Sequence, residues 1–191
     1  MSLKPLAKLL LHGLCVVLAF PFALTCAFGR VPSIFALWAQ LAALFPGIPG
    51  DYLRVAYYSL TLEKCHRESR IQFGSFFAHP EAIVSRLVYI GSYCILGKVH
   101  IGERTQIASG VQILSGRQQH SRSADGAIGG AVDEAFSTIS IGSDCWVGAR
   151  ALVMADVGSR TTIGAGAVVV KPIPDGVVAV GNPARILEPT R

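Results

Sequence analysis

Aliphatic residues in the segment 141–170 recur every six positions, a period that fits neither an α-helix nor a simple alternation. They lie at Ile141, Val147 and Val153 and then, in a new phase, at Val157, Ile163 and Val169. Because so short a unit cannot bury an apolar side chain alone, each unit must be one flat face of a coil that stacks on its neighbours. The pattern predicts a parallel β-helix, and the ordinary strands of a β-sandwich are the alternative.

The same period begins near Ile71 and becomes regular from residue 90 onward. The expected inward-facing residues there are Ile90, Ile95, Ile101, Ile107 and Ile113. The repeat stops in an insertion, residues 115–138, which is polar and glycine-rich, and loops inside a regular scaffold commonly carry function. It is also broken after Val153, because the next aliphatic residue, Val157, follows four positions later and cuts one coil corner short.

Two apolar runs, residues 9–28 and 31–48, precede the repeats. The first has the length that a helix needs to cross the hydrocarbon core of a membrane. Only one cation, Arg30, lies between the two runs. The cations that flank their outer ends are Lys4, Lys8, Arg54, Lys64, Arg67 and Arg70. By the positive-inside rule both ends of such a hairpin are cytoplasmic.

We therefore expect residues 1–50 to form an apolar helical hairpin that anchors the chain on the cytoplasmic side of the cell inner membrane, whether it spans the bilayer or enters it partway. A buried soluble hairpin or trimer contact and a cleaved signal peptide are the alternatives. Residues 51–70 are expected to form an amphipathic linker helix, with Asp51 as its N-cap and with Tyr52, Tyr57 and Tyr58 at the membrane interface. Packing of this helix on the first coil is the alternative.

Composition narrows the possible partners. The 191 residues are enough for one domain plus an appendage, with a mean hydropathy of +0.49 and only 15% charged residues. The net charge of +5 is modest and no aromatic residues interleave the cations, so we expect no nucleic-acid partner. The five cysteines include no Cys-x-x-Cys pair, and we interpret them as reduced packing residues, with a reactive thiol as the alternative.

Two stretches carry a resemblance to a known family. The repeats of 141–170 and the tail Val-Val-Val-Lys-Pro-Ile-Pro-Asp-Gly-Val-Val-Ala-Val-Gly-Asn-Pro-Ala-Arg (168–185) resemble the hexapeptide-repeat acyltransferases, over roughly residues 71–187. The resemblance, closest to the sugar and polysaccharide O-acetyltransferases, implies a left-handed parallel β-helix of three-sided coils that assembles as a homotrimer. It also implies acetyl-CoA as cosubstrate, with no permanently bound cofactor.

The insertion contains the candidate catalytic residue. Its segment Gly-Arg-Gln-Gln-His-Ser-Arg (116–122) resembles the family's catalytic segment, which implies that His120 is a general base. An imidazole suits the removal of a proton from an acceptor hydroxyl as that hydroxyl attacks a thioester at cytosolic pH. Because the sequence has no Gly-x-Ser-x-Gly elbow, transfer is expected to be direct. Asp125, Asp133 and Glu134 are the candidates to orient His120.

The resemblance places coenzyme A in a groove between neighbouring β-helices. It implies that Gly148, Gly164 and Gly166 let the pantetheine arm approach the backbone, that Trp146 walls the thioester end, and that Lys171 and Arg185 meet the phosphates. Each also has a structural interpretation: corner glycines, a packing tryptophan and solubilising cations. No metal is expected, because the zinc-bearing relatives have a close histidine pair that is missing among His79, His100 and His120.

These observations predict an acetyl-CoA-dependent O-acetyltransferase that acts on a membrane-associated saccharide, either a lipid-linked sugar or a surface-polysaccharide intermediate. The apolar runs suggest that the acceptor is held at the membrane. The alternative from another class is a non-catalytic, membrane-anchored β-helix trimer that acts as a scaffold. Transfer of a longer acyl chain to a lipid is a third possibility.

Overall fold

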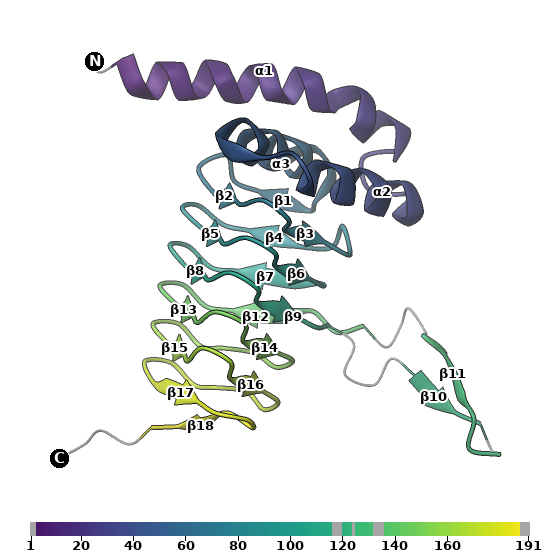
Figure 1. Cartoon of the computed structure of the whole chain (residues 1–191), viewed down its shortest axis with the longest axis vertical. Helices are drawn as coiled ribbons and strands as arrows, with labels where there is room; N and C mark the ends of the chain where they lie inside the picture. The colour runs from purple at the N-terminus through teal and green to yellow at the C-terminus, as the bar shows by residue number, and fades with distance from the viewer. Residues whose placement is uncertain (1–2, 116–119, 124, 132–135, 188–191) are drawn as a thin grey trace.

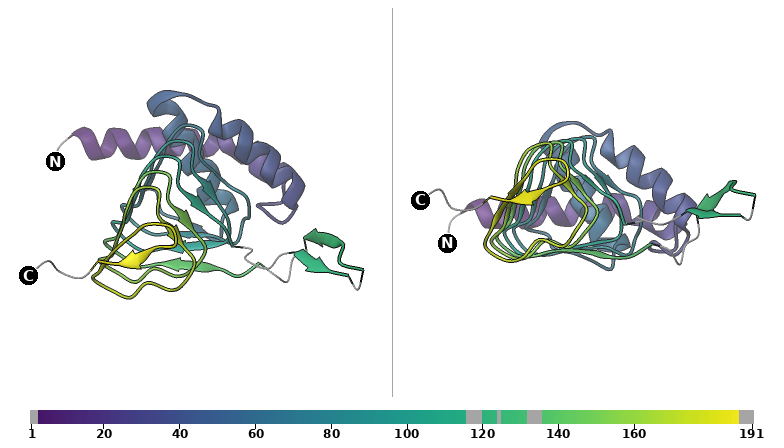
Figure 2. Two further views of the ribbon diagram at one scale, coloured as in Figure 1. Left: turned by 60° about the horizontal axis from the view of Figure 1, so that its bottom comes forward. Right: turned by 90° about the horizontal axis from the view of Figure 1, so that it is seen from below.

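Three helices cover one end of a parallel β-helix (Figure 1). The computed structural model describes residues 3–115, 120–123, 125–131 and 136–187. The helices are α1 (Leu3–Thr25), α2 (Pro32–Ala43) and α3 (Gly47–Thr61). Viewed along its axis the β-helix is three-sided (Figure 2), so the predicted β-helix with preceding apolar helices is confirmed.

The strands of the coils form three sheets, one on each side of the prism. Sheet A contains β1 (Lys64–Cys65), β4 (Ile83–Val84), β7 (Val99–Ile101) and β12 (Ile139–Ile141), and single bridges at Val157 and Ile173 extend it. Sheet B contains β2 (Arg70–Ile71), β5 (Tyr89–Ile90), β8 (Gln106–Ile107), β13 (Trp146–Val147), β15 (Thr162–Ile163), β17 (Val178–Val180) and β18 (Arg185–Ile186). Sheet C contains β3 (Phe76–Phe77), β6 (Ile95–Leu96), β9 (Gln112–Ile113), β14 (Leu152–Val153) and β16 (Val168–Val169).

In most of the two-residue strands the second residue points inward and the first outward, as alternation along a strand requires. The inward residues stack into one aliphatic core along the axis, which includes Ile90, Ile107, Val147 and Ile163. The expectation for Ile95 is wrong. Ile95 is 37% exposed and its neighbour Leu96 is fully buried, because β6 presents its second residue to the core.

The shortened corner after Val153 is a regular feature of the later coils. It joins sheet C to sheet A of the next coil, and the same four-residue step recurs from Val169 to Ile173. Val153 and Val169 pair in register, and so do Val157 and Ile173. Each coil from residue 141 onward is thus uniformly shorter, and the stacking is not interrupted.

Helix α3 caps the first coil, and it differs from the helix expected over 51–70. It begins at Gly47 and ends at Thr61, and the first coil already begins with β1 at residue 64. Pro46 occupies the N-cap position, so Asp51 lies inside the helix and is not its cap. Tyr57 and Tyr58 are buried, which removes them from any membrane interface and favours the alternative of packing on the first coil.

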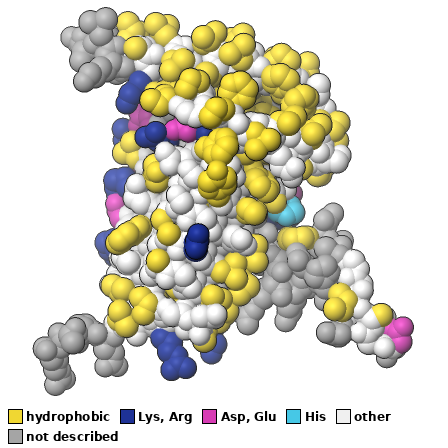
Figure 3. Space-filling view, in the orientation of Figure 1, with side chains coloured by type: hydrophobic (Ala, Val, Ile, Leu, Met, Phe, Trp, Pro, Cys, Tyr) yellow, Lys and Arg dark blue, Asp and Glu magenta, His cyan; other side chains and the backbone are white. Residues whose placement is uncertain are grey.

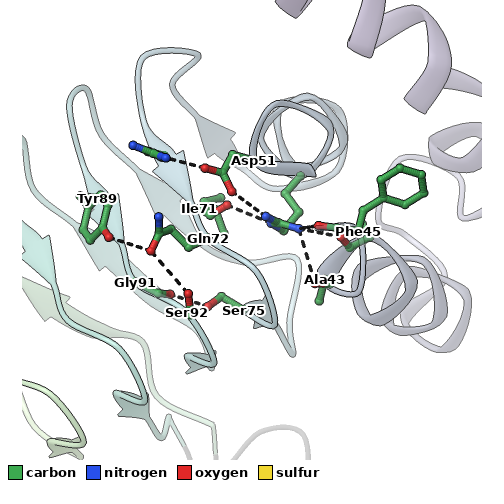
Figure 4. Close-up of polar contacts among 12 residues, drawn as sticks. Ala43, Phe45, Asp51, Ile71, Gln72, Ser75, Tyr89, Gly91 and Ser92 are labelled. Carbon is green, nitrogen blue, oxygen red and sulfur yellow. Dashed lines mark hydrogen bonds and ion pairs between the residues drawn. The ribbon is translucent and has the colours of Figure 1, made fainter. Parts of the chain in front are cut away.

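A buried arginine connects α2, α3 and the first coil, and Figure 4 labels its partners Asp51, Ile71 and Phe45. Arg54 is fully buried, whereas the sequence suggested a cation flanking a membrane segment. Its guanidinium donates to four carbonyl oxygens, those of Ile71 (2.9 Å), Ala42 (3.0 Å), Ala43 (3.4 Å) and Phe45 (2.7 Å). It also pairs with Asp51 at 2.7 Å, and the second oxygen of that carboxylate accepts from Arg70.

The two apolar helices pack on α3 more than on each other. Helix α1 and the turn after it bury a stripe of small residues against α3, namely Cys15, Ala19, Ala23 and Cys26, while the other sides of α1 stay exposed. Among the described residues α1 is the one helix long and apolar enough to cross a membrane. Helix α2 has 12 residues, fewer than the roughly 20 that a span needs, so the second arm of a spanning hairpin is missing.

Substitution of Arg54 by methionine is expected to lower the free energy of unfolding by about 3 kcal/mol, because Asp51 and four carbonyl groups lose a buried partner. Removing one partner of a buried ion pair usually costs about 3–5 kcal/mol, and we expect the lower value because Arg70 still pairs with Asp51. The urea midpoint measures this. The matched control is Arg104→Met, which removes an exposed pair with Asp144 and should leave the midpoint unchanged. Equal effects of the two changes would contradict the structural role of Arg54.

Candidate functional site

Trp146 lies on the outer surface of sheet B. It is the first residue of β13, and its side chain is 59% exposed. Its neighbours in register are Gln106 in the coil before and Thr162 in the coil after. The indole is therefore not a core residue, and it offers an open aromatic surface to a ligand or to another chain.

Gly148 and Gly164 occupy equivalent positions in successive coils, at the corners that join sheet B to sheet C. A Cβ atom at Gly148 would lie 2.4 Å from the backbone nitrogen of Ala165, and one at Gly164 would lie 2.7 Å from Cγ1 of Val180. Both glycines are thus needed for the coils to stack. Gly166 differs, because its φ of +68° favours glycine while the space beside it is open.

The two predicted phosphate-binding cations lie on different parts of the prism. Arg185 in β18 is exposed and pairs in register with Val180, which continues the line of Gly148 and Gly164 along the axis. Lys171 is exposed at a corner from sheet C to sheet A, between Val169 and Ile173. Arg185 therefore lies in line with the glycines, and Lys171 does not.

Arg150 is a further candidate that the sequence interpretation missed. It is exposed at the same corner as Gly148 and forms no ion pair with the residues that the structure describes. Its φ of +58° places it in a tight turn, where its amide donates to the carbonyl of Ser109. The signal for it was present in the sequence: a cation two residues after the corner glycine of the tryptophan-bearing repeat.

The insertion leaves the prism at a corner from sheet C to sheet A. Its ends meet where the amide of Ser137 donates to the carbonyl of Ser115 at 2.8 Å. It contains an antiparallel hairpin of β10 (His120–Arg122) and β11 (Ile128–Ala131), which projects away from the coils (Figures 1 and 2). Asp125-Gly126 at its tip is a common hairpin turn sequence and would have predicted it.

His120 is at the open end of this hairpin, opposite Ala131. Its side chain lies outside the described part of the structure, as do Asp133 and Glu134. Asp125 lies at the turn, where it accepts from the Ser123 hydroxyl and the Ala127 amide, and these bonds lower the pKa of its carboxyl group. Since Asp125 is five residues from His120 along an extended hairpin, roughly 10 Å or more, it is poorly placed to orient the histidine.

One described hollow lies away from all these residues. It is a shallow groove of about 510 Å³ on the outer surface of sheet A, and it includes His100, Ser140, Asp156 and Asp175. The two carboxylates in it accept from the backbone amides of Ser140 and Ser159 in neighbouring coils. Because these acids stabilise the stacking, we place the candidate site on sheet B and at the insertion instead.

The described residues provide no metal centre, and burial makes several of the cysteine thiols less acidic. No group of three or more potential metal-ligating side chains occurs among them. All five cysteines are free, and Cys94 and Cys145 are buried. Burial raises the pKa of both thiols, and it raises the pKa of Cys65 to about 12. The interpretation as reduced packing residues fits this geometry.

The β-helix fold is shared with solved structures of hexapeptide-repeat acetyltransferases. The polySia-specific acetyltransferase NeuO matches with a TM-score of 0.52 and 28% identity, over 64% of this chain and 59% of NeuO. The hexapeptide-repeat acetyltransferase VCA0836 of Vibrio cholerae has a TM-score of 0.63 and 17% identity, over 85% of this chain and 90% of that chain, and thus shows the fold. A second structure of VCA0836 contains acetyl-CoA.

Sequence comparison alone gives shorter matches. No protein-family model matches the chain. YJL218W, a provisionally named acetyltransferase of Saccharomyces cerevisiae, is 35% identical over 51 residues. That match covers 26% of each protein, so the chain spans about a quarter of this curated relative.

The cysteines provide a test of the site's chemistry. With a pKa of about 12 in place of 9.0, Cys65 should be alkylated by iodoacetamide at pH 8 roughly a thousandfold more slowly in the folded protein than after unfolding. Cys94 and Cys145 should also be slowed, since a raised pKa lowers the thiolate fraction. Mass spectrometry of timed samples measures this, with the protein in guanidinium as control. Alkylation of any of the three at the unfolded rate would indicate an activated thiol.

Proposed function

We propose that this chain is an acetyl-CoA-dependent O-acetyltransferase with a saccharide acceptor. The observation that carries the proposal is the β-helix shared with NeuO at 28% identity, a protein whose name specifies acetyl transfer to polySia. The acetyl-CoA bound to VCA0836 supports the choice of cosubstrate. The exposed Trp146, the aligned corner glycines and the exposed Arg150 form a surface suited to a long, anionic molecule.

His120 acts as the general base in the proposed reaction. The acceptor hydroxyl gives its proton to the imidazole while its oxygen bonds to the thioester carbon. A backbone amide holds the negative charge that develops on the carbonyl oxygen. The carbon–sulfur bond then breaks, and the imidazolium returns the proton to the departing coenzyme A thiolate. This route needs no enzyme nucleophile, in keeping with the buried, weakly acidic thiols.

The site is proposed to form between copies of the chain in a homotrimer. Trp146, Gly148, Arg150 and Arg185 lie on sheet B and its corner to sheet C, whereas Lys171 and the base of the insertion lie at corners from sheet C to sheet A. These corners are on different edges of one prism, and the hairpin projects away from the strands of sheet B (Figure 1). A neighbouring copy that supplies its insertion and Lys171 would complete the site.

The proposed acceptor is a lipid-linked saccharide used in surface-glycan assembly, at the cytoplasmic side of the cell inner membrane. The comparison with NeuO supports a saccharide, and the apolar exposed sides of α1 support a lipid carrier. NeuO matches 64% of this chain, so the lipid part of the proposal rests on this chain's own α1 and not on the comparison.

Replacing His120 by alanine should lower the rate of acetyl transfer by roughly 10²–10⁴ and leave acetyl-CoA binding intact. The measurement is the incorporation of labelled acetyl from acetyl-CoA into a saccharide-containing membrane extract. His66→Ala is the matched control, because this histidine lies in a turn of the first coil where its Nδ1 accepts from the Glu68 amide. An unchanged rate in the His120 variant would contradict its role as the general base. If the native protein does not bind acetyl-CoA, the alternative of a non-catalytic scaffold is favoured.

Arg150→Ala and Arg185→Ala should each raise the KM for acetyl-CoA roughly tenfold with little change in kcat, because a charge-assisted contact to a phosphate is lost. Steady-state kinetics with varied acetyl-CoA measure this. Arg160→Ala is the control: Arg160 is also an exposed arginine with a φ of +55°, but it lies at the corner between sheets A and B. The same increase in all three variants would mean that net charge alone matters.

A further inference from the structure

We propose that α1 lies parallel to the membrane plane and docks the β-helix upright on a lipid bilayer, with its first coil nearest the lipid. This inference rests on the membrane part of the proposed function and defines how the membrane is bound. In this arrangement α1 lies in the membrane surface, whereas in a spanning hairpin it would cross the bilayer. Helix α1 runs across the end of the β-helix (Figure 1), so a bilayer that receives α1 lies across the axis of the coils.

The surface that meets the lipid is apolar and continuous. Along α1 the side chains of Leu10, Leu14, Val17 and Leu24 are 57–69% exposed, and Leu44 and Ile48 beyond α2 are exposed to a similar degree. Apolar side chains cover this end of the molecule in the space-filling view (Figure 3). Scattered apolar residues are normal on a protein surface, but a patch formed by several turns of helix indicates an interaction site.

The packing of α1 excludes a spanning orientation in the described arrangement. The stripe of Cys15, Ala19, Ala23 and Cys26 holds α1 against α3, and the Arg54 contacts hold α3 against the first coil. If α1 crossed the bilayer with these contacts intact, the first coil beside it would enter the hydrocarbon. That coil exposes several charged side chains, Glu63, Lys64, Arg67, Glu68 and Arg70, whose burial in lipid is costly.

Charge favours a bilayer over a second copy of this chain as the partner. Residues 1–50 contain no aspartate or glutamate, and the described cations Lys8 and Arg30 of this segment are exposed. Two copies docked through this surface would bring like charges together, whereas an anionic bilayer would attract them. Lys64 and Arg67, exposed on the first coil, lie where headgroups would meet the protein.

This orientation places a limit on the acceptor. Three coils lie between α3 and the base of the insertion, and adjacent coils are spaced by about 4.8 Å. The base of the insertion is therefore roughly 10 to 15 Å beyond the first coil, which itself lies below the helices. A hydroxyl group of a lipid headgroup would not reach that level, so the acceptor is a saccharide of several sugar units carried on a lipid.

Flotation of the intact protein with vesicles tests the docking without any reaction. Vesicles of phosphatidylcholine with and without phosphatidylglycerol are compared for the native protein, the double variant Leu10→Glu/Val17→Glu, and Leu187→Glu. Leu187 is 53% exposed at the opposite end of the chain and serves as the matched control. We expect binding that is strengthened by phosphatidylglycerol, weakened at least about tenfold in the double variant and unchanged in the control.

Depth distinguishes docking in the plane from spanning. In three variants a cysteine replaces Leu10, Val17 or Leu24 and is labelled with an environment-sensitive fluorophore. Lipids that carry spin labels at known depths quench the fluorophore. The native protein, treated in the same way, gives the background from the native cysteines. Equal shallow depths at all three positions support the proposal, and a label at position 17 much deeper than the other two overturns it. The proposal is also overturned if the native protein does not float, if it forms a dimer that the double variant abolishes, or if residues before 27 are removed in the mature protein.

The experiments distinguish a failure of membrane docking from a failure of the proposed acetyl transfer. A protein that floats but transfers no acetyl group retains the docking and loses the chemistry. A protein that acetylates soluble saccharides but does not float retains the chemistry and loses the docking.

Discussion

The guanidinium of Arg54 is a fully buried cation, and its contacts determine how the helices are placed on the coils. A charge removed from water is tolerated only when hydrogen bonds and an opposite charge replace the lost hydration. Four backbone carbonyls and Asp51 do so here, and they come from α2, the segment after it, α3 and the first coil. Any movement of the helices relative to the coils would break these contacts. The orientation of α1 is therefore coupled to that of the candidate site.

Much of the β-helix could be predicted from the sequence, because stacked coils require an aliphatic residue at fixed intervals. The error at Ile95 arose where two aliphatic residues, Ile95 and Leu96, are adjacent and either could face inward. The role of Arg54 could not be predicted, since a cation after an apolar run reads as a flanking charge until the carbonyls that surround it are known. For the same reason Asp51 resembled an N-cap, although it pairs with two arginines inside the packing.

The candidate site was predictable in part. The sequence interpretation named Trp146, Gly148, Gly164 and Arg185, and register aligns the last three along one line beside sheet B. It could not place the corners in space, so it grouped Lys171 with them and overlooked Arg150. The glycines also have a structural reason to be present, because a side chain at Gly148 would collide with the next coil. The resemblance alone points to His120, whose backbone is described at the base of the hairpin.

The most direct measurement compares acetyl transfer to one saccharide in two forms, linked to a lipid in vesicles and free in solution, by the native protein and by the Leu10→Glu/Val17→Glu variant. If α1 presents the site to a membrane-held acceptor, the native protein prefers the lipid-linked form. The variant then loses that preference while it keeps its rate on the free form. Equal rates on both acceptors for both proteins would contradict a membrane-docked acetyltransferase.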